Sequence, residues 1–213
     1  MENKVVILSA PSGCGKTTIL QALMKMGLPL EFSISATSRP KRANEEDGKD
    51  YYFFTPEQFQ EKIRQQAFLE WNEVYTNQFY GTLMSEIERI AHNGNHVIFD
   101  VDVKGGLSIK ERFGKSALAI FVMPPSLEAL RERLLHRGTE TPESLEKRLQ
   151  RAGYEISFSK QFDYVLVNDD LEKAIDEAYT CILSFLEGKE MPGSDNAGKS
   201  GPNNPEKSGP NSL

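Results

Sequence analysis

The stretch Ala10-Pro11-Ser12-Gly13-Cys14-Gly15-Lys16-Thr17 decides how the rest of this chain is interpreted. The apolar run Val5–Leu8 precedes it, and apolar residues at helical spacing follow it from Ile19 to Met24. Strand, glycine loop and helix in this order predict a phosphate-binding loop, because small residues let several backbone N–H groups point at one anion. The helix N-terminus behind the loop adds a partial positive charge. The alternative is a chance glycine turn before a helix, but this context favours nucleotide binding.

Two side chains of the loop have predicted tasks. Lys16 can reach the β- and γ-phosphates of a nucleotide, and the Thr17 hydroxyl can hold Mg²⁺. The motif usually begins with glycine, and Ala10 stands at that least demanding position. The residues expected to surround the phosphates are Ala10, Pro11, Ser12, Gly13, Cys14, Gly15, Lys16, Thr17 and Thr18.

The bulk composition limits the class of protein. The chain has 213 residues, of which 38% are hydrophobic, enough for one large domain or a core with small insertions. Its formal net charge of −6 argues against a general binder of nucleic acid or of anionic membranes, which would carry a basic face. Cys14 and Cys181 form neither a metal-ligand pattern nor a disulfide framework, and no signal-peptide pattern precedes the first strand. We therefore expect a cytoplasmic protein.

Strand and helix patterns alternate along most of the chain. Nearly continuous apolar runs predict buried parallel strands at Val5–Leu8, Val97–Phe99, Leu118–Val122 and Tyr164–Val167, with a fifth candidate at Phe32–Ala36. Helical apolar faces lie between and after them, and helix starts are predicted at Thr55, Thr141 and Asp169. The sequence therefore predicts an α/β fold with a parallel sheet flanked by helices.

Three segments depart from this alternation. Residues 37–90 combine a polar stretch, an aromatic run and a short helix, and they predict an inserted mixed α/β lobe in a core made of residues 1–36 and 91–190. The polar segment around Arg137–Thr141 predicts a short mobile lid over about residues 137–148. Residues 191–213 are rich in Gly, Pro, Asn, Ser and Lys and predict a disordered tail.

The order of the motifs along the chain resembles that of the guanylate kinase family. The stretches that carry this resemblance are Ser33–Arg42, Asp47–Phe53, Phe68-Leu69-Glu70-Trp71, Tyr80-Gly81-Thr82, Asp100-Val101-Asp102 and Arg137-Gly138-Thr139-Glu140, together with the phosphate loop. The resemblance covers about residues 3–188. It implies a P-loop kinase that transfers a phosphoryl group from ATP to GMP, with Mg²⁺ as cofactor, and that serves nucleotide salvage and GTP supply.

The acceptor phosphate is expected to meet arginine and tyrosine side chains. Arg39 and Arg42 can form bidentate hydrogen bonds with it, and Tyr51 and Tyr80 can each donate from a hydroxyl group. The resemblance implies these contacts at matching positions. The alternative for two arginines in a polar loop is a solvated surface.

Guanine recognition is expected of Glu70. Guanine offers two adjacent donors, N1–H and the exocyclic N2–H₂, whereas adenine presents a lone pair at N1, so a carboxylate discriminates between them. The resemblance places Ser35, Thr82 and Asp102 at the guanine end as well. The alternative is that Glu70 is a surface charge beside a buried Trp71.

The remaining predicted site residues serve the transferred phosphate. Asp100 ends an apolar strand and is expected to hold Mg²⁺ through water, the alternative being a helix cap or a turn residue. If the strand continues to Asp102, both carboxylates face one side. Arg137 and Arg148 match arginines that close over the phosphates, Arg133 could point inward beside Arg137, and Asn168 matches a position near the adenine or else caps a helix. For Arg151 we prefer a surface ion pair.

Two other functions stay open at this point. A non-catalytic binding module of the same shape would keep the GMP lobe but lose ATP-site residues, and Lys16, Thr17 and Asp100 argue against it. A kinase of this fold could also use another acceptor, but Glu70 argues for GMP or dGMP. The expected partners are these nucleotides, with no nucleic acid and no membrane, and the sequence is compatible with a homo-oligomer.

Overall fold

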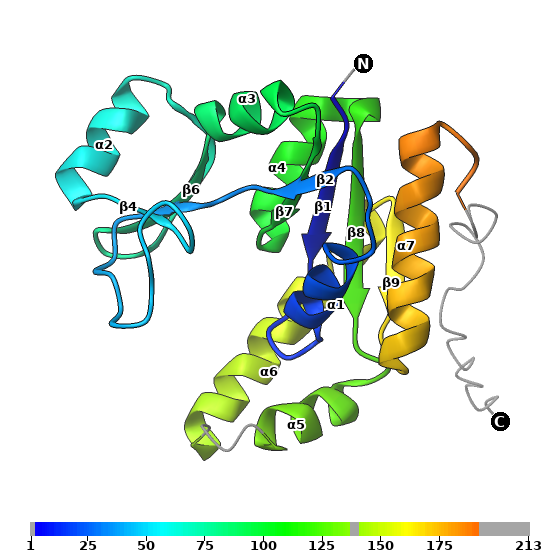
Figure 1. The fold of residues 1–213 in the computed structure, drawn as a ribbon. Coiled ribbons are helices and arrows are strands. Elements are labelled where there is room, and N and C mark those ends of the chain that lie inside the picture. Colours follow the sequence, from blue (N-terminus) through cyan, green and yellow to red (C-terminus); the bar gives the residue numbers. More distant parts are fainter. Residues whose placement is uncertain (1–2, 137–140, 192–213) are drawn as a thin grey trace, which may run out of the picture.

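The core is a five-stranded parallel sheet in the order β2-β7-β1-β8-β9. The structure, a computed structural model, describes residues 3–136 and 141–191 (Figure 1). The strands of this sheet are β1 (Val5–Ser9), β2 (Leu30–Phe32), β7 (His96–Asp100), β8 (Ala117–Met123) and β9 (Tyr164–Val167). The α/β fold and the four apolar strand predictions are confirmed.

Helices cover both faces of this sheet, which is why its central strands are apolar at nearly every position except their ends. Along β1, Val6 and Leu8 face one apolar cluster while Val5 and Ile7 face the other. The first cluster is completed by α1 (Lys16–Leu23), α5 (Leu127–His136), α6 (Pro142–Ile156) and α7 (Leu171–Glu187), and the second by α3 (Met84–His92) and α4 (Val103–Phe113). Short 3₁₀ helices lie at Gly114–Ser116 and Ser159–Gln161.

A second, smaller sheet lies beside the core (Figure 1). Its order is β4-β3-β6-β5, and its elements are β3 (Ala36–Thr37), β4 (Tyr52–Phe53), α2 (Pro56–Arg64), β5 (Phe68–Tyr75) and β6 (Gln78–Leu83). We call this unit the lobe. It has its own apolar cluster, in which the ring of Phe59 stacks on Phe68 at 4.3 Å and on Phe79 at 5.4 Å between centroids.

The strand predicted at Phe32–Ala36 is wrong, because the chain changes sheets within it. Phe32 pairs with Ile98 in the core sheet, whereas Ala36 pairs with Gly81 in the lobe. The N–H of Ser33 still donates to the carbonyl of Ile98 at 3.0 Å, so the crossing begins there. One apolar run thus serves two sheets, which its periodicity does not reveal.

Helix starts follow local chemistry closely. Thr55 forms the predicted capping box with Gln58, and the helix start predicted at Thr141 is confirmed by a capping box with Ser144. The start predicted at Asp169 is wrong by one residue, since Asp170 caps α7 by accepting from the N–H of Lys173 at 3.0 Å. No described helix is long and apolar enough to cross a membrane. The predicted tail from residue 192 and lid residues 137–140 lie outside the described residues.

Candidate active site

The phosphate loop lies between the carboxyl end of β1 and the start of α1. Gly13 and Gly15 have φ of 97° and 86°, left-handed values that glycine adopts without strain. Gly15 is also the N-cap of α1, and because it has no side chain, the first N–H groups of the helix are left for an anion. A pocket of roughly 820 Å³ opens over this loop and is lined by all residues from Ala10 to Thr18.

Asn168 supports the loop from beneath. Its Nδ2 donates to the carbonyl of Cys14 at 2.8 Å, and a Cβ on Gly15 would overlap the same amide. The backbone carbonyl of Asn168 accepts from Arg133 Nη2 at 2.8 Å. The capping alternative for Asn168 is wrong, because Asp170 caps α7. The adenine contact stays a prediction, and Arg133 binds backbone at the carboxyl end of β9.

Lys16 and Asp100 meet where two parallel strands end. Asp100 is the last residue of β7 and stands opposite Leu8 of β1. The Lys16 ammonium forms an ion pair with the Asp100 carboxylate and donates to the Val101 carbonyl at 3.1 Å. Asp102, rather than Asp100, caps α4, accepting from the N–H of Gly105 at 2.9 Å. The strand ends at Asp100 and does not reach Asp102, yet both carboxylates line the same pockets.

A second pocket, of roughly 260 Å³, adjoins the first from the lobe side. Its lining includes Ser35, Tyr51, Glu70, Tyr80, Asp100 and Asp102. Tyr51, Tyr80, Asp100 and Asp102 also line the loop pocket, so the two pockets are continuous. The structure therefore brings together side chains of the core and of the lobe that are far apart along the chain.

Glu70 faces into this second pocket from β5. It accepts from the Thr82 hydroxyl at 2.8 Å, and its burial raises the pKa of the carboxyl, with the nearby Asp102 adding to the rise. The alternative of a surface Glu70 beside a buried Trp71 is wrong, since Trp71 is 47% exposed. A register irregularity between Phe68 and Glu70 breaks the expected alternation of the strand.

Arg39 lies on the lobe against two aromatic rings. Its guanidinium carbon is 5.0 Å from the Tyr51 ring centre and 5.6 Å from that of Phe53. Its Nη1 and Nη2 donate to the two carboxylate oxygens of Glu45 at 2.7 and 2.5 Å. Arg42 is exposed, and its backbone N–H donates to Glu45 at 2.9 Å. The sequence prediction missed Glu45, which looks like one charge among several in a polar loop.

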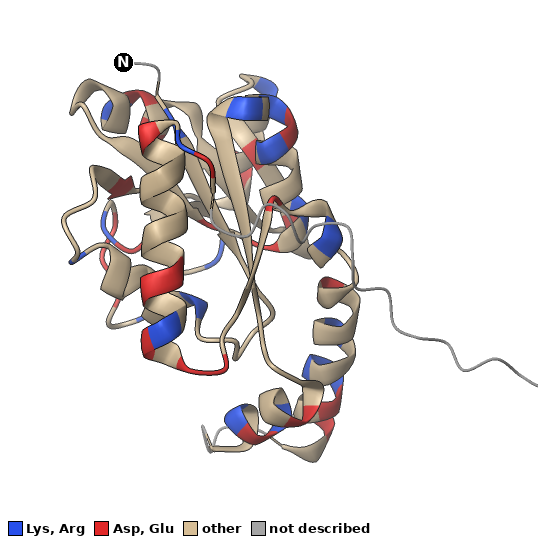
Figure 2. Cartoon of the chain, turned by 90° about the vertical axis from the view of Figure 1, so that its right-hand side faces the viewer, with Lys and Arg blue, Asp and Glu red and all other residues tan. Residues whose placement is uncertain are grey.

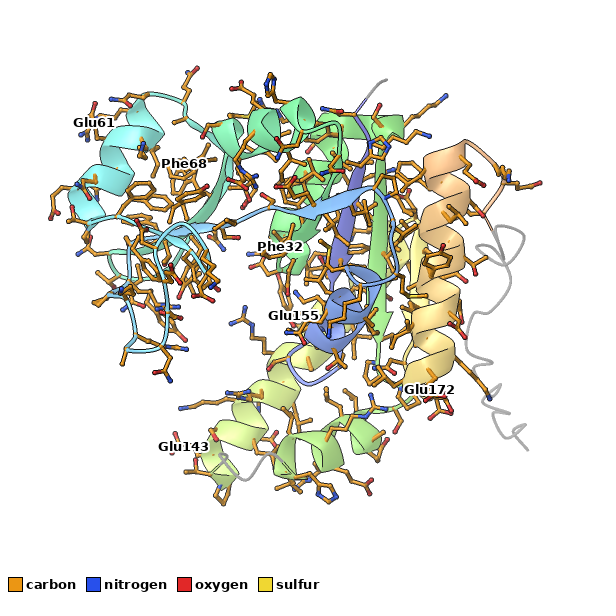
Figure 3. All side chains as sticks on the ribbon, in the orientation of Figure 1. Phe32, Glu61, Phe68, Glu143, Glu155 and Glu172 are labelled. Atoms are coloured by element: carbon orange, nitrogen blue, oxygen red, sulfur yellow. The ribbon has the colours of Figure 1, made fainter. Side chains whose placement is uncertain are left out.

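Helix α6 brings two arginines to the loop pocket. Arg148 Nη1 donates to the Ser12 hydroxyl at 3.1 Å. Arg151 Nε pairs with Glu155 at 2.9 Å, so the ion pair predicted for Arg151 is present. Both residues also line the loop pocket. Figure 3 shows Glu155 beside the phosphate loop, a buried carboxylate that the sequence did not single out. Arg137 lies outside the described residues.

Comparison with known proteins decides the family. The model of the family described as guanylate kinase matches residues 2–184. The chain belongs to the guanylate kinase family. It is similar to the guanylate kinase of Bacteroides fragilis, with 51% identity over 87% of this chain and 91% of that protein, and to the guanylate kinase of Porphyromonas gingivalis, with 47% identity over 86% and 98%.

A solved guanylate kinase has the same architecture. The crystal structure of guanylate kinase from Anaplasma phagocytophilum superposes with a TM-score of 0.68 at 29% identity, covering 89% of this chain and 88% of that one. Membership of the guanylate kinase family indicates an ATP:GMP phosphotransferase, as the sequence predicted.

The contact between Asn168 and the loop gives a direct test. Asn168→Asp replaces the Nδ2 donor with an oxygen that repels the Cys14 carbonyl, so we expect the KM for ATP to rise about tenfold and the protein to lose about 1–3 kcal/mol of stability. The KM for GMP should change little. Steady-state kinetics and thermal unfolding measure these effects.

The neighbouring exchange Asp169→Asn is the matched control, because Asp169 is exposed and its side chain does not enter the loop contact. An unchanged KM for ATP in Asn168→Asp would remove Asn168 from the support of the phosphate loop.

Proposed function

We propose that this protein transfers the γ-phosphoryl group of ATP to GMP and to dGMP in an Mg²⁺-dependent reaction. The products are ADP and GDP or dGDP, and GDP would feed the supply of GTP. The observation that carries the proposal is the continuity of the two pockets. A loop built for phosphates opens directly into a pocket that is lined by the half-buried carboxylate of Glu70.

The ATP side of the site is built on the core. The N–H groups of residues 13–18 and the Lys16 ammonium would hold the β- and γ-phosphates, with Arg148 reaching over Ser12. Arginines around the transferred group stabilise the charge that spreads over its oxygens. We assign Arg137 to the same task, and Arg133 with Asn168 to the region where the adenosine end would lie.

The GMP side is built on the lobe. Ionised Glu70 accepts from guanine N1–H and N2–H₂, and the Thr82 hydroxyl at 2.8 Å fixes the orientation of its carboxylate. Ser35 and Asp102 line the same pocket as Glu70 and would lie around the base. The acceptor phosphate would be bound by Tyr51, Tyr80, Arg39 and Arg42.

The residues present fit Mg²⁺. Thr17 and Asp100 line the loop pocket, and within the ranges 3–136 and 141–191 no group of three His, Cys, Asp or Glu could hold a metal alone. The Asp100 carboxylate and the Thr17 hydroxyl, completed by phosphate oxygens and water, are oxygen ligands of the kind that Mg²⁺ prefers. When bound, the ion neutralises phosphate charge. In this structure Lys16 pairs with Asp100. An arriving γ-phosphate would replace Asp100 as the partner of Lys16 and so free the carboxylate.

No strong general base is needed. The acceptor is a phosphate that is largely ionised near neutral pH, so the residues above bring two anions in line and screen their repulsion. Lys16, Arg148 and Arg151 line the loop pocket on the core side, and Arg39 would add a cation from the lobe beside Tyr51.

A coupled assay for ADP tests the function. With ATP and Mg²⁺ we expect rapid turnover of GMP and dGMP. The kcat/KM for AMP should be lower by about 10⁴, because adenine lacks the N1–H group from which Glu70 accepts a hydrogen bond. Removal of Mg²⁺ with EDTA should abolish turnover. Equal rates with GMP and AMP, or full activity without a divalent ion, would contradict the proposal.

Glu70→Gln tests the specificity assignment in two ways. The amide can no longer accept from both guanine donors, so the KM for GMP should rise by about a hundredfold while the KM for ATP stays near its starting value. Since burial raises the pKa of Glu70, its ionised form costs stability at neutral pH. The variant should therefore unfold at a higher temperature at pH 7, and this gain should shrink as the pH falls through the raised pKa and vanish well below the ordinary pKa of 4.5, where the carboxyl is protonated in both states.

Glu88→Gln provides the control, because Glu88 is exposed on α3 outside both pockets. Equal changes in the KM for GMP and for ATP would show that Glu70 does not contact the base.

A further inference from the structure

The ion pair of Arg39 and Glu45 is unusually well enclosed for a polar loop. The two side chains are 11% and 15% exposed. Glu45 Oε2 accepts from both Arg39 Nη1 at 2.7 Å and the backbone N–H of Arg42 at 2.9 Å, while Oε1 accepts from Arg39 Nη2 at 2.5 Å. One carboxylate thus joins the two arginines assigned to the acceptor phosphate.

A count of donors shows which edge of the guanidinium is used. Arginine has five N–H groups in a planar fork. Both N–H groups of Nη1 are taken, one by Glu45 and the other by the Pro40 carbonyl at 3.0 Å, and one N–H of Nη2 goes to Glu45. The Nε–H and the second N–H of Nη2 lie parallel on the remaining edge, which neither Glu45 nor Pro40 occupies. That edge has the spacing that binds two oxygens of a phosphate.

The surroundings fix the direction of this edge. The faces of Tyr51 and Phe53 pack against the guanidinium, which restrains its plane. A hydrogen bond with the Tyr80 hydroxyl contributes to the raised pKa of Arg39, and Tyr80 lines both pockets. Because Glu45 and Pro40 take the other N–H groups, Tyr80 meets the remaining edge, and this edge lies beside the tyrosine assigned to the same phosphate.

We propose that Glu45 is a positioning residue for the acceptor nucleotide: it holds the terminal edge of Arg39 so that the Nε–Nη2 edge is presented to the phosphate of GMP. The inference rests on the proposed function, because it deepens the assignment of Arg39 to that phosphate. Glu45 itself contacts no substrate in this arrangement. Without it, Arg39 would lose a preset orientation and the phosphate would have to order a free side chain.

A carboxylate that competed with the phosphate for Arg39 would bind a different edge of the guanidinium. A competitor would occupy the edge that faces the pocket, whereas Glu45 occupies the terminal edge and is tied to the backbone of Arg42. Hydrogen bonds from Arg39 and from the Arg42 N–H hold the pKa of Glu45 at about 2. The carboxylate therefore stays ionised at every pH at which the enzyme would be assayed.

The test compares binding of GMP and guanosine, which differ only in the phosphate. Glu45→Gln keeps the size of the side chain but loses the charge and one acceptor, so we expect GMP to bind about tenfold more weakly. Guanosine binding and the KM for ATP should be unchanged, and kcat at saturating GMP should fall less than kcat/KM. Isothermal titration and steady-state kinetics give these values. Glu45→Asp, with its charge kept and one methylene removed, should lose less.

Glu46→Gln is the control, since Glu46 is the next residue and its side chain is 69% exposed beside Lys49. GMP binding that is unchanged or tighter in Glu45→Gln overturns the inference, and tighter binding would identify a competitor. An equal loss for guanosine also overturns it, because Glu45 would then only maintain the lobe. If wild-type protein binds GMP no better than guanosine, or if Arg39→Lys keeps the full preference for GMP, the phosphate site of the proposed function fails instead.

Discussion

The contact of Lys16 with Asp100 organises the whole site. It exists because β1 and β7 are parallel neighbours that end at the same edge of the sheet, one followed by a glycine loop and the other by a carboxylate. The Lys16 ammonium needs an anion, and in this structure Asp100 supplies it. Under the proposed function, the phosphates of ATP would be the stronger anion at the same place. Asp100 also lines the pocket that contains Glu70. One carboxylate at the edge of the core sheet therefore belongs to both pockets.

The second constraint is charge repulsion between two phosphorylated nucleotides. Lys16 and Arg148 line the pocket on the core side, and Arg39 on the lobe packs against Tyr51, which lines both pockets. Elsewhere Figure 2 shows basic and acidic residues on most helices of the side with α7, while α7 itself carries Glu and Asp with Lys173, in keeping with the acidic net charge of −6. The positive groups are thus few and local, which suits small phosphorylated substrates.

Features that depend on neighbours along the chain were predictable from the sequence. The phosphate loop, the capping box at Thr55, the helix start at Thr141 and the fully buried strands follow from spacing and turn chemistry alone. Features that depend on the crossing between sheets were not. The run at 32–36 divides between two sheets, and an irregular register on β5 buries Glu70 while exposing Trp71. The Glu45 contact requires a loop conformation that no periodicity encodes, so the sequence located Arg39 without its partner.

The central claim is that one continuous cleft holds an ATP-like chain of phosphates and a guanine nucleotide at the same time. The most direct measurement is the affinity of a compound in which adenosine and guanosine are joined through five phosphates. The account predicts that it binds at least about a hundredfold more tightly than ATP or GMP, since both pockets are filled at the entropic cost of one association. An affinity no better than that of ATP, in protein that binds ATP and GMP separately, would contradict it.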